Sequence, residues 1–224
     1  MTRNSVAIAS ALMVGTMIAV ALGVGAIIPG DLRLPTQWGV NGEADAFSGK
    51  WPALLMPAGI VAAVSLLFYF LPALEPRREG LERSQGLYLW GWAALLMMGG
   101  TIQLAVVSVA LGWGIPANQL IVGAVGIMLV IIGNQLGKSR SMYLVGIRTP
   151  WTLASEEVWI KTHRLGGKLT VAGGVVLAMA ALLPLPSGLL ATILLAVVAV
   201  AAGVPALYSF LLWRREKRSP QPNE

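Results

Sequence analysis

The chain has 224 residues, of which 56% are hydrophobic and only 12% are charged. A soluble domain carries roughly a quarter of its residues as charges, so this chain lacks the polar surface that a water-soluble fold requires. The absence of cysteine and the presence of a single histidine exclude thiolate chemistry, Cys-ligated metal and a His-cluster metal site within one chain. The composition therefore predicts an integral membrane protein with no metal and no other cofactor.

Six apolar runs follow one another along the chain, and none of their cores contains Asp, Glu, Lys, Arg or His. A helix needs about 20 mostly apolar residues to cross the hydrocarbon core. In lipid the backbone must satisfy its own hydrogen bonds, which favours helices for runs of this length. We predict an all-α integral membrane fold with six transmembrane helices, at roughly Ser5–Ile28, Trp51–Leu71, Leu89–Leu111, Ala117–Leu136, Leu169–Leu183 and Leu189–Trp213.

The basic residues predict the orientation of these helices. If both termini lie in the cytoplasm, 14 of the 16 lysines and arginines fall in inside segments, and only Arg33 and Lys50 lie outside. Cytoplasmic segments of membrane proteins carry such an excess of positive charge. The net charge of +6 is then an orientation signal that faces anionic lipid head groups, and direct binding of nucleic acid is not predicted.

This topology divides the chain into four parts. Residues 1–72 form an N-terminal helical hairpin with an outer loop at 29–50, and residues 73–87 form a cytoplasmic linker. Residues 88–213 form a four-helix region with a cytoplasmic segment at 137–168, and residues 214–224 form a polar tail. Small residues recur four apart at Gly15, Ala19 and Gly23 and again at Gly174 and Ala178, which lets helices approach closely. We interpret these stripes as packing within the bundle, with dimerisation as the alternative.

The outer loop contains an aromatic residue among acidic ones. Asn41-Gly42 is a strong turn signal. Trp38 offers an apolar surface, and Asp45 is one of the carboxylates that make this face acidic. The loop is either a compact turn packed on the bilayer or a recognition surface for an extracytoplasmic molecule that is apolar or cationic. The residues assigned to recognition are Pro35, Trp38, Asn41, Gly42 and Asp45.

The inner segment contains the signals of a short helix. Thr152 or Ser155 can cap its N-terminus, and Glu156 and Glu157 then lie in the first turn, where the helix dipole favours them. Glu157 and Lys161 have the spacing of a helical ion pair. We predict a short amphipathic helix at the inner membrane surface, in the loop between the fourth and fifth spans and leading into the fifth.

The same segment holds the main candidates for chemistry. His163, Glu156 and Glu157 are general acid–base groups, but Glu156 and His163 lie about two helical turns apart, too far for a direct pair. No nucleophile elbow, phosphate loop or metal-binding histidine pattern is present. His163 is interpreted as a hydrogen-bonded residue at the membrane interface. Arg148 is interpreted as an organiser, whose five donors tie loop carbonyls or a lipid phosphate together.

Gly133-Asn134-Gln135-Leu136, Gly146 through Leu153, Ser155 through Trp159 and Thr162-His163-Arg164 together closely resemble the signature of the SdpI family of polytopic bacterial membrane proteins. The outer loop resembles the companion N-terminal domain of that family, although Gln37 and Gly39 stand where histidine and asparagine are common. The resemblance marks as the cytoplasmic motif Asn134, Gly146, Arg148, Thr149, Pro150, Trp151, Thr152, Glu157, Trp159, Thr162, His163 and Arg164.

The resemblance implies a protein of the bacterial plasma membrane that confers immunity to a secreted peptide toxin. It also implies that the presence of the toxin is signalled to a cytoplasmic DNA-binding repressor. The expected partners are then membrane lipids, the toxin and the repressor, and no enzymatic activity is expected. Two alternatives remain. A small-solute or lipid transporter would be favoured by intramembrane ionisable residues and inverted repeats, neither of which is found. A membrane-embedded enzyme would use His163 and the neighbouring carboxylates.

Overall fold

The computed structural model describes residues 2–39, 43–76 and 78–218. Six helices in this part of the chain are long and apolar enough to cross a membrane, which confirms the predicted number. The elements are α1 (Arg3–Ile27), β1 (Arg33–Trp38), β2 (Ala44–Gly49), α2 (Lys50–Leu74), α3 (Arg78–Arg83), α4 (Gln85–Ala110), α5 (Ala117–Leu136), α6 (Pro150–Ala154), α7 (Glu156–Ala181) and α8 (Ser187–Glu216).

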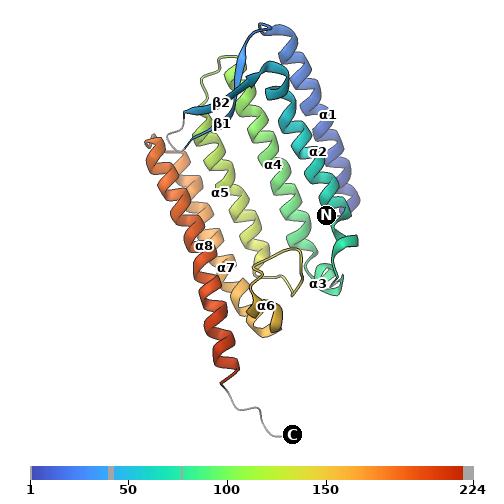
Figure 1. Cartoon of the computed structure of the whole chain (residues 1–224), viewed down its shortest axis with the longest axis vertical. Coiled ribbons are helices and arrows are strands. Elements are labelled where there is room, and N and C mark those ends of the chain that lie inside the picture. Colours follow the sequence, from blue (N-terminus) through green and yellow to red (C-terminus); the bar gives the residue numbers. More distant parts are fainter. Residues whose placement is uncertain (1, 40–42, 77, 219–224) are drawn as a thin grey trace.

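The long helices lie side by side in one bundle (Figure 1). The first three, α1, α2 and α4, pack against one another, and α4 also packs against α5. The most extensive contact joins α5 to α7, which in turn packs against α8. The strands β1 and β2 cover one end of the bundle, called here the hairpin end. The short helices α3 and α6 lie at the opposite end, called here the motif end (Figure 1).

The hairpin end departs from the all-α prediction. β1 and β2 form a two-stranded antiparallel sheet in which Arg33 is paired with Gly49 and Trp38 with Ala44. The predicted Asn41-Gly42 turn lies outside the described residues. Lys50 begins α2 directly after β2, and its ammonium group donates to the carbonyls of Gly25 and Ile28 at the end of α1. The sheet is therefore connected to α2 without a linker, and the first residue of α2 is joined to the end of α1 by hydrogen bonds.

The fifth span is longer than the apolar pattern predicts. Residues 156–168 do not form a separate interfacial helix, because α7 runs without a break from Glu156 to Ala181. Ser155 caps its N-terminus, with its hydroxyl accepting a hydrogen bond from the backbone of Val158. The polar residues of this segment interrupt the hydropathy pattern, but none of them is a helix breaker. The predicted cap at Ser155 is confirmed, and the helix that it begins leads without a break into the fifth span.

Glycines allow α5 and α7 to meet backbone to backbone. A Cβ atom on Gly126 would lie 2.6 Å from the amide nitrogen of Ala178, and one on Gly174 would lie 2.8 Å from that of Val130. The stripe in the fifth span therefore packs within the bundle, as predicted. The stripe in α1 does not, because ideal Cβ atoms on Gly15 and Gly23 would have nothing within 4 Å. For α1 the prediction of packing within the bundle is wrong.

Candidate functional site

The coil between α5 and α6, residues 137–149, is called here the motif loop. Its backbone is held by side chains from other elements, because the segment has no helical or sheet ladder to satisfy its N–H groups. The hydroxyl of Ser84 accepts from the amide of Arg140 at 2.7 Å, and the carboxylate of Glu156 accepts from that of Ser141 at 3.3 Å. The loop is thus fixed both to the start of α4 and to the start of α7.

Glu75, at the end of α2, makes the strongest of these attachments. One carboxylate oxygen accepts the amide of Tyr143 at 2.9 Å, and the other accepts the amide of Leu144 at 2.8 Å. The side chain is only 2% exposed. Glu75 is not among the predicted site residues, because it lies in the predicted linker. A signal was present, since a carboxylate at a helix C-terminus is unfavourable for the helix dipole and needs a partner elsewhere.

His163 is fully buried against the motif loop. Its Nε2 atom accepts a hydrogen bond from the backbone N–H of Ile147 at 2.9 Å, and its Nδ1 atom lies 2.9 Å from the carbonyl of Trp159. A backbone N–H can only donate and a carbonyl can only accept, so the ring fits as the neutral tautomer with its proton on Nδ1. The imidazole also stacks on the Trp159 indole, with ring centroids 3.9 Å apart.

Gly146 makes this stacked pair possible. It adopts a φ of +116°, a conformation that side chains with a Cβ rarely take. A Cβ atom at this position would lie 2.7 Å from Nε2 of His163 and 2.9 Å from the Trp159 ring. Backbone conformation and available space therefore both require glycine. The family motif here specifies one compact contact among Gly146, Trp159 and His163.

The short helix α6 is defined by its cap. Thr149 and Thr152 form a reciprocal capping box, and Pro150 occupies a first-turn position where a missing N–H costs nothing. The Thr152 hydroxyl also donates to the carbonyl of Ile147 at 2.8 Å. A hydrogen bond of 3.0 Å joins the hydroxyls of Thr149 and Ser209, which connects α6 to α8.

Aromatic contacts reinforce the connection between α6 and α8. The ring of Trp151 lies 5.0 Å from that of Phe210 and 6.4 Å from that of Trp213, measured between centroids. Neither partner on α8 belongs to the predicted motif, and no local spacing rule connects either of them with Trp151. These contacts explain why a tryptophan stands directly after the proline of α6.

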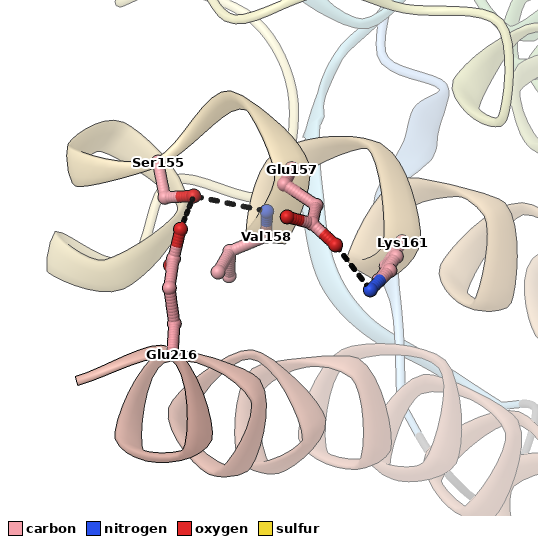
Figure 2. Close-up of polar contacts among 5 residues, drawn as sticks. All are labelled: Ser155, Glu157, Val158, Lys161 and Glu216. Atoms are coloured by element: carbon pink, nitrogen blue, oxygen red, sulfur yellow. Dashed lines mark hydrogen bonds and ion pairs between the residues drawn. The ribbon is translucent and has the colours of Figure 1, made fainter. Parts of the chain in front are cut away.

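The first turn of α7 carries polar contacts to α8 (Figure 2). The Ser155 hydroxyl, which caps α7, also donates to the Glu216 carboxylate of α8 at 3.1 Å. Glu157 pairs with Lys161 one turn later, as predicted. This pair is exposed and contributes little to stability. Glu157, Lys161 and Glu216 line one pocket between the start of α7 and the end of α8.

The predicted motif residues thus differ in what they contact. Gly146, Thr149, Pro150, Trp151, Thr152, Trp159 and His163 converge on the contacts described above. Asn134, Arg148 and Arg164 are exposed, and Arg148 donates to the carbonyl of Tyr143 at 2.9 Å, in agreement with the organising role predicted for it. Thr162 is fully buried, and its hydroxyl has no hydrogen-bond partner among the described residues.

The predicted recognition residues lie at the hairpin end, remote from the motif loop. Pro35 is buried in β1, whereas Asp45 is exposed on β2. Trp38 is half-buried and packs against a cluster that includes Leu34 and Leu54. Asn41 and Gly42 lie outside the described residues. The site therefore consists of two separate surfaces connected by the bundle.

The motif end also contains an open, charged cavity of about 750 Å³. Arginines and glutamates line it in similar number, so it has no single sign of charge. Gly80 of α3 closes one wall, because its backbone lies directly against the carbonyl of Ser141. The charged residues that line the cavity are Glu79, Arg83, Arg140 and Glu156.

Comparison with known proteins relates this chain to one protein family. Residues 138–209, which include most of the motif loop and nearly all of α6 to α8, match the SdpI/YfhL protein family. The chain is also 28% identical to the immunity protein SdpI of Bacillus subtilis (strain 168) over 147 residues, which cover 66% of this chain and 68% of that protein. No solved structure matches significantly. The predicted family resemblance is confirmed, and with six membrane-competent helices the chain is a multi-pass bacterial membrane protein.

Proposed function

Because residues 138–209 match the SdpI/YfhL protein family, we propose that this protein protects its bacterial cell from a secreted antimicrobial peptide. The observation that carries the proposal is the similarity to an immunity protein over two-thirds of the chain, together with six membrane-competent helices. A protein embedded in the membrane stands where a peptide that arrives from outside first reaches the cell.

Both termini are proposed to lie in the cytoplasm, with the motif end inside and the hairpin end outside. The distribution of basic residues supports this orientation, because 14 of 16 fall in segments on the motif side. The secreted peptide then meets β1 and β2, and the motif loop faces the cytoplasm. In this division residues 1–72 carry the outer loop and are joined by the linker 73–87 to the four-helix region 88–213, whose segment 137–168 carries the cytoplasmic motif.

The second part of the proposal is that the motif end signals to a cytoplasmic DNA-binding repressor. The buried motif residues, among them Trp159 and His163, hold the loop in one shape. The side chains of Arg148 and Arg164 are exposed and available to a partner at the motif end. An effect of the peptide on the motif end requires that the peptide bind two states of the bundle with different affinity.

An enzymatic role finds little support in the geometry of the one histidine. Both ring nitrogens of His163 face backbone groups, so neither is directed toward a substrate. A general base needs to reach the proton that it abstracts. The proposed role is therefore binding and signalling rather than catalysis. The cores of the six spans also lack the ionisable residues that mark proton-coupled transport.

A protection assay tests immunity. The chain is expressed in a bacterium that is sensitive to the secreted peptide of the source organism, and membrane insertion is verified by fractionation. We expect survival at peptide concentrations that kill the empty-vector strain. Unchanged killing with full insertion would reject the immunity role.

Signalling is tested separately by affinity purification of the protein from its own cells in gentle detergent, with and without the peptide. We expect a DNA-binding protein to be captured by the wild type, and capture to be lost in Arg164→Glu. The matched control is Arg33→Glu, which reverses a charge at the hairpin end. Equal capture by both variants would contradict a contact at the motif end.

A further inference from the structure

A cavity of about 340 Å³ lies beneath the hairpin, where β1 meets α4, α5 and α8. It is called here the hairpin cavity. Ligand pockets begin at about 300 Å³, so the space suits one or two large side chains rather than a whole folded partner. Its walls are mainly apolar, and its lining includes Trp38, Ile102, Ile121, Val122, Leu190 and Leu194.

Three polar side chains, those of Thr36, Asn118 and Ser187, interrupt the apolar wall. The amide of Asn118 donates to the hydroxyl of Ser187 at 2.6 Å, joining the outer ends of α5 and α8. The Ser187 hydroxyl proton and the Asn118 carbonyl oxygen can each form a further hydrogen bond. A few placed polar groups in an apolar pocket are typical of sites that orient a ligand.

A carboxylate lies beside the cavity. Gly39 lines it, and a Cβ atom on Gly39 would lie 2.7 Å from Oδ1 of Asp45. A side chain at position 39 would therefore occupy the space that the Asp45 carboxylate takes. The cations of this end are turned to the backbone, since Arg33 donates to the carbonyl of Phe47 and Lys50 to those at the end of α1. The charge presented beside the cavity is negative.

We propose that the hairpin cavity binds an apolar side chain of a cationic peptide, with an amine or guanidinium of that peptide beside Asp45. This inference rests on the proposed function and identifies where the secreted peptide is bound. The carboxylate favours such a peptide over the other apolar occupant of a membrane, a phospholipid chain, because it repels the lipid phosphate. The aromatic wall at Trp38 gives a large contact area for an inserted side chain.

The chain has no cysteine, so a single introduced thiol reports on the cavity without background. Leu194→Cys places the thiol in the cavity wall, and Leu195→Cys places it at the same depth on an exposed, lipid-facing position. Both variants are reconstituted in nanodiscs and treated with a cationic or an anionic methanethiosulfonate reagent. We expect Leu194→Cys to react about tenfold faster with the cationic reagent, and Leu195→Cys to react slowly with both.

Two further variants locate the source of the charge preference. Asp45→Asn removes the carboxylate, and Gly39→Ala displaces it. Each is expected to bring the two reagents to within about twofold of each other at Leu194→Cys. If the preference persists in both variants, the carboxylate does not govern the cavity and the proposal is overturned.

The occupant is tested with two synthetic amphipathic peptides of equal length, one of leucine and lysine and one of leucine and glutamate. We expect the lysine peptide to slow labelling of Leu194→Cys at least fivefold and the glutamate peptide to leave it unchanged. Equal shielding by both peptides, or shielding by neither, would overturn the proposal. A lipid occupant would be identified instead if the labelling rate changed with the acyl-chain length of the nanodisc lipid and neither peptide affected it.

The protection assay distinguishes this inference from the proposed function. Ala191→Trp fills the cavity wall, and the variant is compared with wild type for insertion and thermal stability. Full protection by a stably inserted Ala191→Trp, with no peptide shielding of Leu194→Cys, would reject the cavity and leave immunity standing. No protection by the wild type would reject immunity whatever the labelling shows.

Discussion

The carboxylate of Glu75 accepts the backbone N–H groups of both Tyr143 and Leu144, which joins the end of α2 to a loop that lies far along the chain. Both carboxylate oxygens are used, and the group is buried. The end of α2 therefore fixes the position of a loop that lies almost entirely within residues 138–209, which match the family.

Glu75→Gln is expected to release the motif loop. The carboxamide keeps one acceptor but turns its NH₂ group toward the second backbone N–H, so one hydrogen bond to a charged group is lost and one buried donor is left unsatisfied. We expect a loss of about 1.5–3 kcal/mol of stability. Faster trypsin cleavage after Lys138 or Arg140 in the loop would report the release. The control is Glu79→Gln, whose side chain is 88% exposed; equal cleavage rates in the two variants would contradict the role of Glu75.

Gly146→Ala is expected to destabilise the protein strongly, because the new Cβ meets the stacked pair and the positive φ is strained. The strain alone costs of order 1–3 kcal/mol. Thermal unfolding in detergent measures the effect. Gly203→Ala on α8 is the matched control, since a Cβ there would have nothing within 4 Å and alanine is favoured in a helix by roughly 0.5–1 kcal/mol. If both variants unfold at the same temperature, the close contact at Gly146 does not exist.

The protonation pattern of His163 can be read directly by nitrogen NMR, since it is the single histidine of the chain. We expect a neutral ring near pH 7 with the proton on Nδ1, because the Ile147 amide points at Nε2. His163→Phe keeps a ring on Trp159 but leaves that amide without its acceptor, at a cost of about 1–3 kcal/mol. A spectrum with the proton on Nε2 would show that the hydrogen bond from Ile147 is absent.

Gly126→Val is expected to separate α5 from α7, because the backbone of α7 lies where the new side chain would stand. Overpacking of a closely packed contact costs typically 1–3 kcal/mol, and more where backbone atoms must move. Yield of inserted protein and thermal stability measure the effect. Gly15→Val on α1 makes the same change at an open position and should behave like wild type. A drop in stability of Gly15→Val without one in Gly126→Val would mean that the stripe in α1 is packed and that the contact between α5 and α7 is open.

The sequence predicts those features that depend on local pattern. Residues Ala117–Leu136 form α5 with the bounds that hydropathy alone indicates, and Ser155 caps α7 as its position before two glutamates predicts. Both signals are contained within one or two helical turns. The ion pair between Glu157 and Lys161 is predictable for the same reason.

The features that were missed depend on contacts between distant segments. The bond from Tyr143 to Glu75 joins two coil positions whose local sequence gives no spacing rule. Pairing of β1 with β2 was missed because Pro35 interrupts the strand pattern, which is typical of edge strands. The predicted start of the fifth span lies too late in the chain. The first half of α7 carries charged residues, which lower the mean hydropathy of that stretch below that of an apolar span.

The connection of α2 to both ends of the bundle fixes its length. Its first residue follows the sheet directly, and Glu75 follows its last residue. One inserted residue would turn the Glu75 carboxylate by about 100° and advance it by about 1.5 Å, which removes it from both loop amides. An inserted full turn would restore the angle but overshoot by about 5.4 Å. Unlike α8, whose last turns extend past α6 (Figure 1), α2 has no freedom to lengthen in a thicker bilayer. Its register is therefore constrained by the sheet at one end and by this glutamate at the other.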